Sequence, residues 1–259
     1  MNIENIRVFN FENALRGMRN PKESWHLSDS YYGISFNDPE EIESITHGQE
    51  WKTIYIDGDI CEYASIGPKD MKLAQGLIKA GSEHRKFMRQ IFVSMDIAAP
   101  IYWWKEMDTY KLATTANSTS TMHKLTSKPI TLDCFEIGDY NNSLPLIDPV
   151  NLGIRIDCLI GDLEQLRQLY LMNIERSKQE DISESERKNY QNLARSYWKE
   201  LVRWLPCGWI QTRTWTGNYE NLLSIVHQRA NHKLIEWHYF VDKIKTLPYA
   251  QELIFCNEN

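Results

Sequence analysis

Hydrophobic and polar positions along the chain predict short strands toward the N-terminus. Residues 51–56 and 91–97 alternate between apolar and polar side chains, which is typical of strands. Between them, residues 68–79 carry apolar side chains at helical spacing behind a proline, and Gly81 is placed to end that helix. Pro100, just beyond the second strand, indicates a change of chain direction.

Longer helices are expected in the second half of the chain. From Leu159 to Tyr170, apolar residues share one helical face. Ser183 and Glu186 have the spacing of a capping box, so a second helix begins there. Its apolar face carries Leu193, Tyr197, Leu201 and Trp204, and Pro206 ends it. Two further helices are expected, with apolar positions at Leu222, Leu223, Val226, Leu234, Trp237, Val241 and Ile244. Strands first and helices later predict an α+β protein, interpreted as one domain over residues 1–259.

Composition and charge exclude several classes of protein. The 259 residues can bury a substantial core, and a formal charge of −6 gives no support for a basic face that binds nucleic acid. Five cysteines without a C-x-x-C pair argue against a zinc ribbon and a complete disulfide framework, and the seven histidines have no ligand spacing, so no metal is expected. With no secretory signal and no apolar run near ~20 residues, we expect a cytoplasmic protein without a membrane span.

Residues 99–124 are the most distinctive segment. Two adjacent indoles, Trp103 and Trp104, precede a stretch dense in Ser and Thr that ends at His123 and Lys124. Hydroxyl groups beside lysine suit a nucleotide or phosphate pocket. The alternative is a polar surface loop whose two indoles pack in the core.

This segment resembles the signature of the flavin-dependent thymidylate synthases, in which an Ala-Pro-Ile strand end leads to Arg-Gln and then to Arg-His-Arg. Residues 99–101 match the strand end, residues 105–106 stand in place of Arg-Gln, and residues 109–111 occupy the Arg-His-Arg position. With one extra residue allowed, the family's Asn, Glu, second Ser and final Arg fall on Asn117, Ser118, Ser120 and Met122.

A second block strengthens the resemblance. The family's Leu-Pro, Trp-Thr-x-Asn, Ser-Leu, Arg and final Glu correspond in order and spacing to residues 205–206, 215–218, 222–223, Arg229 and Glu236. Residues 126–192 then form a divergent insertion.

The resemblance implies a central antiparallel sheet with helices, a homotetramer whose sites draw on several subunits, FAD as hydride carrier, and C5 methylation of dUMP with methylenetetrahydrofolate and NADPH. It implies that Arg229 polarises the uracil and is the catalytic residue. It further implies that the nucleotide is bound by Ser118, Ser120 and Arg203, of which Arg203 lies one residue out of frame with the family's arginine. The flavin is bound, by the same resemblance, by Lys111, Asn117, Asn218, His123 and Lys124.

Departures from the family pattern leave alternatives open. At Thr109 and Met122 the family's phosphate-binding arginines are lost, at a cost on the order of 1.5–3 kcal/mol each. The basic cluster His84, Arg85, Lys86 and Arg89 could compensate, or it could be a solvated helix face. Arg229 could form a surface ion pair, and Asn218 could cap the following helix. The alternative function is a non-catalytic or repurposed nucleotide-binding relative, and the nucleotide itself (dUMP, UMP or a cytidine nucleotide) stays open.

Overall fold

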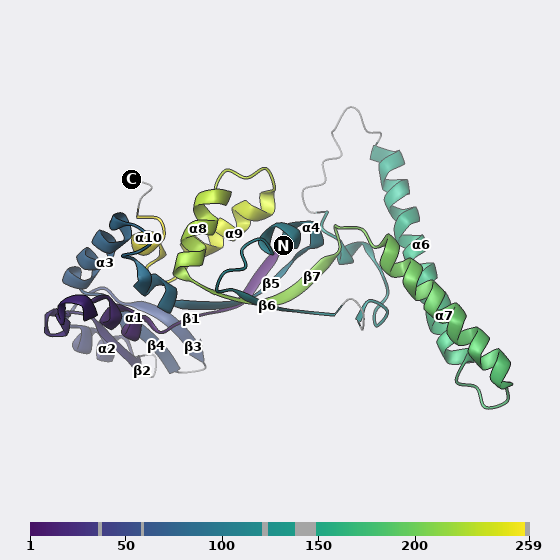
Figure 1. Ribbon diagram of the computed structural model, residues 1–259, viewed down its shortest axis with the longest axis horizontal. Coiled ribbons are helices and arrows are strands. Elements are labelled where there is room, and N and C mark those ends of the chain that lie inside the picture. Colours follow the sequence, from purple (N-terminus) through teal and green to yellow (C-terminus); the bar gives the residue numbers. More distant parts are fainter. Residues whose placement is uncertain (36–37, 58–59, 121–123, 138–148, 257–259) are drawn as a thin grey trace. The chain divides into compact units, whose positions relative to one another are not determined.

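The computed structural model describes residues 1–35, 38–57, 60–120, 124–137 and 149–256. The chain divides into two compact units (Figure 1). The larger unit holds residues 2–97, 107–117 and 213–259, and the smaller holds Met1 and residues 98–106 and 118–212. The prediction of one domain over the whole chain stays a prediction.

Helices and strands are interleaved along the larger unit. Its N-terminal elements are β1 (Asn2–Phe9), α1 (Phe11–Met18), the 3-10 turns η1 (Asn20–Lys22) and η2 (Trp25–Leu27), β2 (Tyr31–Ser35), α2 (Pro39–Thr46), β3 (Lys52–Asp57), β4 (Ile60–Ser65), α3 (Pro68–Ala80) and η3 (Lys86–Gln90). The predicted order of strands first and helices later is therefore wrong, although the α+β class is confirmed. The buried residues of α1, namely Phe11, Ala14, Leu15 and Met18, have helical spacing, a pattern from which no helix was predicted.

An antiparallel three-stranded sheet has the order β2-β4-β3, and its strand β3 confirms the strand predicted from residue 51. Gly33 of β2 pairs with Tyr63 of β4. A Cβ at position 33 would lie 2.8 Å from the Tyr63 hydroxyl, so this close approach requires glycine.

Helix α3 confirms the helix predicted behind Pro68. Its N-terminus is capped from a distant turn, because the Asp29 carboxylate accepts hydrogen bonds from the backbone N–H groups of Lys69 (3.0 Å) and Asp70 (3.1 Å). Gly81 follows the helix with φ +114°, a backbone conformation that residues other than glycine rarely adopt.

A four-stranded sheet has the order β1-β5-β7-β6 and includes β5 (Phe92–Pro100), β6 (Thr115–Ser118) and β7 (Ile210–Asn218). Alternate β5 residues are buried, namely Val93, Met95, Ile97 and Ala99, which confirms the predicted strand. The chain turns after Pro100 into α4 (Ile101–Met107), as expected.

Helices α8 (Tyr219–Arg229), α9 (Ile235–Lys245) and α10 (Ala250–Leu253) complete the larger unit. Helices α8 and α9 pack against each other (Figure 1). The predicted apolar positions Leu222, Leu223, Val226, Trp237, Val241 and Ile244 are buried. Leu234, also predicted as an apolar position, is half-buried and precedes α9 as its N-cap.

The smaller unit contains a helical hairpin of α6 (Pro149–Arg176) and α7 (Glu184–Trp204). The capping box of Ser183 and Glu186 is present, whereas α6 begins ten residues before the predicted Leu159. Leu163 and Leu201 join a core cluster with Leu125, Ile130 and Phe135. Trp204, expected on the apolar face of α7, is 64% exposed. Among the described helices, none is long and apolar enough to cross a membrane.

Candidate functional site

A groove of about 590 Å³ in the larger unit is lined by basic and polar side chains from segments that are far apart in the sequence. Three segments line it, with residues Arg85, Arg89, Thr109, Tyr110, Lys111, Leu112, Ala113, Asn218, Glu220, Asn221 and Ser224. We call it the cationic groove. It brings together Lys111 and Asn218, two residues predicted to hold a flavin.

The loop of residues 108–114 is held at several points. Asp108 forms an ion pair with Arg213 (Oδ1 to Nη1, 2.8 Å), and the Leu112 carbonyl accepts a hydrogen bond from Asn221 Nδ2 (2.9 Å). Ala113 has φ +58°, and Thr114 donates its hydroxyl to the Tyr110 carbonyl. These contacts fix the backbone of Tyr110 and Lys111 at the edge of the groove.

The first turn of α8 forms another wall. Asn218 is 2% exposed and caps the helix reciprocally with Asn221: each side-chain oxygen accepts from the other residue's backbone N–H, at 2.9 and 3.1 Å. The predicted capping role is confirmed. The amino group Nδ2 of Asn218 makes no hydrogen bond within the described part of the chain. A helix N-terminus carries partial positive charge and favours anions.

Charges in the groove are unevenly balanced. Arg85 is paired with Glu220 (Nε to Oε2, 2.8 Å), and both side chains are less than one-fifth exposed. Arg89 donates to the neutral Ser82 carbonyl (3.2 Å), and Lys111 is exposed. Arg89 and Lys111 therefore keep their charges for an anionic ligand, whereas the charge of Arg85 is largely compensated.

Arg229 is the last residue of α8 and is clamped by two aromatic side chains. Its guanidinium lies over the rings of Trp237 (4.7 Å) and Tyr110 (5.5 Å), and its Nε donates to the Tyr110 hydroxyl (2.8 Å). That hydroxyl in turn donates to Gln228 (3.1 Å). Because Tyr110 also lines the cationic groove, Arg229 is held next to it.

The remaining predicted site residues lie elsewhere. Asn117 is exposed at the edge of the larger unit, and Ser118, Ser120, Lys124 and Arg203 belong to the smaller unit. Arg203 pairs with Glu200 on the surface of α7. His123, like Met122, lies outside the described residues.

Both indoles of the distinctive segment, Trp103 and Trp104, are fully buried, and Trp104 Nε1 donates to the Gln211 carbonyl (2.9 Å). Core packing, the alternative for these two residues, is therefore confirmed. No site role was predicted for Tyr110, Glu220 or Trp237. Only the proximity of Glu220 to Asn218 could have signalled one of them.

Comparisons with known proteins identify the fold. No protein-family model and no curated protein matches the chain. Its structure is similar to a crystal structure of flavin-dependent thymidylate synthase ThyX from Helicobacter pylori complexed with FAD and dUMP, with 15% identity, a TM-score of 0.53 and coverage of 98% of each chain. A second structure of ThyX from Helicobacter pylori with FAD and dUMP has 13% identity, a TM-score of 0.51 and coverage of 98% of this chain and 97% of that chain. The chain thus has the fold of the flavin-dependent thymidylate synthases, which confirms the resemblance at the level of the fold.

Proposed function

We propose that the chain is a flavin-dependent enzyme that methylates a pyrimidine nucleotide at C5, as in the conversion of dUMP to dTMP. The observation that supports this function is the cationic groove, in which a chain with the thymidylate synthase fold places Lys111 and Asn218 beside Arg89. The relatives with this fold were crystallised with FAD and dUMP.

The residues of the groove fit the FAD pyrophosphate. A pyrophosphate needs cations and N–H donors, and Lys111, Arg89, the first turn of α8 and the amino group of Asn218 supply both. A volume of about 590 Å³ also lies in the range of small-ligand sites. When bound, FAD supplies the hydride, while methylenetetrahydrofolate supplies the carbon and NADPH the reducing equivalents. We assign Asn117, His123 and Lys124 to the flavin as further contacts.

Arg229 acts on the pyrimidine in this proposal. A guanidinium that Tyr110 and Trp237 hold in place can direct its N–H groups at a uracil carbonyl and stabilise negative charge there. Because the aromatic clamp fixes the side chain beforehand, little conformational entropy is lost when the nucleotide binds. Ser118, Ser120 and Arg203 are proposed as additional nucleotide contacts, and a homotetramer as the working assembly.

A non-catalytic nucleotide-binding protein is the second candidate. The loss of the family's arginines at Thr109 and Met122 favours it, because fewer cations remain to hold the phosphates of the flavin.

A turnover assay separates the two functions. Purified protein is incubated with FAD, NADPH, methylenetetrahydrofolate and dUMP, or UMP in a parallel sample, and the methylated nucleotide is quantified by mass spectrometry. The proposal predicts product with the wild-type protein and none with Arg229→Lys. Binding of FAD and dUMP without product would instead establish the second candidate.

A further inference from the structure

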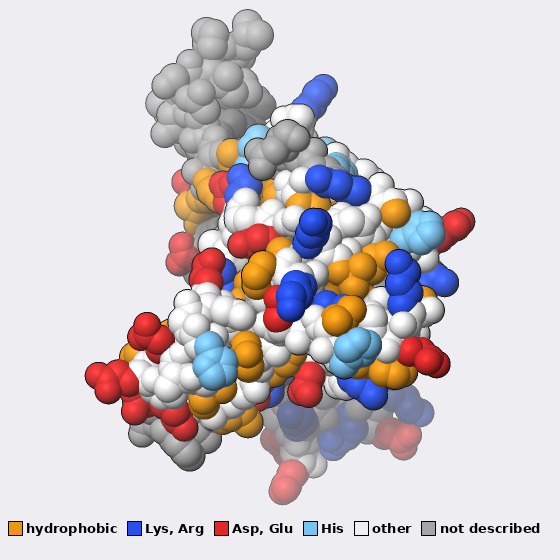
Figure 2. Space-filling model, turned by 90° about the vertical axis from the view of Figure 1, so that its left-hand side faces the viewer, with side chains coloured by type: hydrophobic (Ala, Val, Ile, Leu, Met, Phe, Trp, Pro, Cys, Tyr) orange, Lys and Arg blue, Asp and Glu red, His pale blue; other side chains and the backbone are white. Residues whose placement is uncertain are grey.

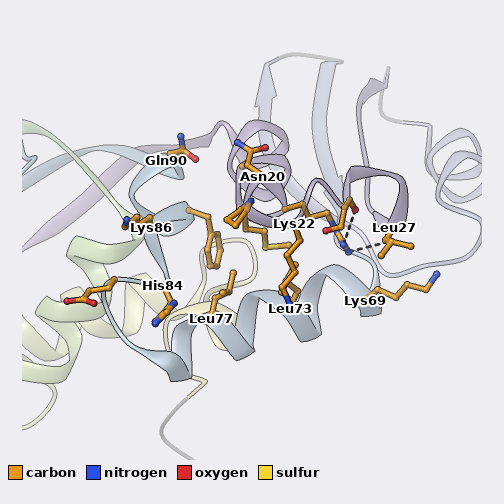
Figure 3. A pocket seen from close by; sticks show the side chains of 16 residues that line it. Asn20, Lys22, Leu27, Lys69, Leu73, Leu77, His84, Lys86 and Gln90 are labelled. Carbon is orange, nitrogen blue, oxygen red and sulfur yellow. Dashed lines mark hydrogen bonds between the residues drawn. The ribbon is translucent and has the colours of Figure 1, made fainter.

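A second groove in the larger unit has a volume of about 860 Å³ and is mainly apolar (Figure 3). It lies between the segment from α1 to η2 on one side and α3 with η3 on the other. Its apolar lining, here called the floor, comprises buried Met18 and Phe87 and half-buried Leu73 and Leu77. Leu27, which is 49% exposed, also lines the groove, and the exposed lysines Lys22, Lys69 and Lys86 form what we call its rim. We call it the lysine-rimmed groove.

The floor consists of aliphatic and thioether side chains with one aromatic ring. Leu73 and Leu77 are one turn apart on α3 and extend from it toward the opposite wall (Figure 3). Met18 and Phe87 are 8% and 3% exposed, so the apolar lining includes side chains of the core. Such a surface favours the hydrocarbon part of a ligand.

The local charge at the rim is positive, opposite in sign to the net charge of the whole chain. The formal net charge is −6, yet the groove is bordered by three lysines and His84 against one carboxylate, Glu83. Lys69 lies toward one end of α3, Lys86 beside His84 toward the other, and Lys22 between them (Figure 3). On the side that carries α1, α2 and α3, hydrophobic side chains lie at the surface among Lys and Arg side chains (Figure 2). This charge pattern favours a ligand that is anionic as well as apolar.

The groove is pre-formed, because buried contacts fasten its two walls together. Arg19 is 5% exposed and donates Nε to the carboxylate of Asp70 on α3 (2.6 Å). The same guanidinium donates to the carbonyls of Leu27 (3.2 Å) and Ser24 (3.3 Å), which holds η2 against α3. Asp70 also accepts hydrogen bonds from the hydroxyls of Ser28 and Ser30, at 2.6 Å each. Ligand binding therefore loses little conformational entropy, because the walls of the groove are already ordered.

The lysine-rimmed groove is distinct from the cationic groove. Segment 84–90 separates them, with Arg85 and Arg89 lining the cationic groove and His84, Lys86 and Phe87 lining this one. The basic cluster of the sequence is therefore shared between two cavities.

We propose that the lysine-rimmed groove binds a free fatty-acid carboxylate, with the chain along Leu73 and Leu77 and the carboxylate at the rim lysines. The aliphatic floor fits a hydrocarbon chain better than it fits a polar nucleotide. The volume falls within the range of small-molecule sites. The proposal does not depend on the proposed enzymatic function.

The fluorescent fatty acid 11-(dansylamino)undecanoate tests this site by titration into the full-length protein. Saturable binding with a blue shift of dansyl emission is expected, and the uncharged methyl ester should bind about tenfold more weakly. Lys69→Gln and Lys86→Gln should each weaken binding about two- to fivefold, since partly exposed ion pairs contribute little individually. Lys72→Gln, on the same helix but outside the lining, is the matched control and should bind like wild type.

Leu77→Asn should weaken fatty-acid binding about tenfold or more, because it replaces half-buried hydrocarbon with an amide. Thermal unfolding confirms that each variant is folded, and FAD titration of the same variants should be unchanged. The proposal is overturned if wild type does not bind the probe, if acid and ester bind equally, or if a folded Leu77→Asn variant binds like wild type. The fatty-acid proposal is also overturned if the groove binds an acidic helical peptide and does not bind the fatty-acid probe.

Discussion

Arg229 illustrates how much a single side chain depends on its neighbours. Its guanidinium lies between Tyr110 and Trp237, so a lysine there would lose the planar fork and most of the stacking. We predict that Arg229→Lys abolishes most binding of dUMP and UMP while leaving the fold intact. Arg229→Ala should cost on the order of 2 kcal/mol of binding free energy. Calorimetric titration of both nucleotides measures these effects.

A matched control for Arg229 lies in the smaller unit, where the guanidinium of Arg176 is 5.8 Å from the centre of the Tyr190 ring. Arg176→Lys should leave nucleotide binding unchanged. Identical isotherms for wild type, Arg229→Lys and Arg229→Ala would remove Arg229 from the site, since a surface ion pair contributes less than about 1 kcal/mol and affects no ligand.

Asp96 connects three strands of the four-stranded sheet and makes stability depend on pH. Its carboxylate accepts hydrogen bonds from the Thr214 hydroxyl on β7 and from Asn5 Nδ2 on β1 (2.7 Å). These two bonds, that of Thr214 first, lower the pKa of Asp96 below its ordinary value. A carboxyl whose pKa is lower in the folded state stabilises the fold above its unfolded pKa, about 3.9, and loses that contribution as pH falls through the folded pKa.

We therefore predict that Asp96→Ala lowers the free energy of unfolding at pH 7 by about 1 kcal/mol, a modest amount because the group is partly exposed. The difference from wild type should shrink below about pH 4. Urea unfolding at a series of pH values measures it, with the exposed Asp181→Ala as control. A difference that stayed constant down to pH 2 would show that the carboxylate charge is not involved.

At the scale of single elements, Asn218 combines a helix cap with a proposed ligand contact, and two substitutions separate these roles. Asn218→Ser keeps a cap acceptor but loses the amino group, so stability should stay near wild type while FAD binding weakens. Asn218→Ala should also cost about 1 kcal/mol of stability. Ser183→Ala removes the equivalent cap of α7 and should cost a similar amount with no effect on FAD. Full FAD affinity in Asn218→Ser would assign the residue to capping alone.

Elements with strong local signals could be predicted from the sequence, and those set by tertiary contacts could not. Helices α3, α7 and α8 have a proline, a capping box or an asparagine cap at their starts, and these signals act within a few residues. The cationic groove depends instead on the loop before β6 meeting the start of α8. The N-terminal cap of α3 comes from Asp29, far away in sequence. No periodicity indicates such contacts.

The site residues follow the same division. Motif spacing pointed to Lys111, Asn218 and Arg229, because the family pattern is local in sequence. The pair of Arg85 with Glu220 and the stacking of Trp237 on Arg229 depend on how separate segments pack together. Sequence therefore identified several site residues but not their partners.

For the whole molecule, the resemblance implies an assembly of four chains, and the nine tryptophans and thirteen tyrosines are of types enriched in interface cores. We predict a homotetramer at micromolar concentration, measured by size-exclusion chromatography with light scattering. A monomeric mass at that concentration would contradict the prediction and any site shared between subunits.

The cationic groove is proposed to bind FAD, and a titration of apo-protein with FAD at low and high salt measures this binding. We expect saturable binding at low salt that weakens strongly at high salt, because exposed Lys111 and Arg89 contacts are screened. Lys111→Gln and Arg89→Gln should each weaken binding, whereas Lys72→Gln should not. Absence of binding at low salt, or tight binding that neither salt nor these two substitutions affects, would show that the cationic groove does not bind FAD.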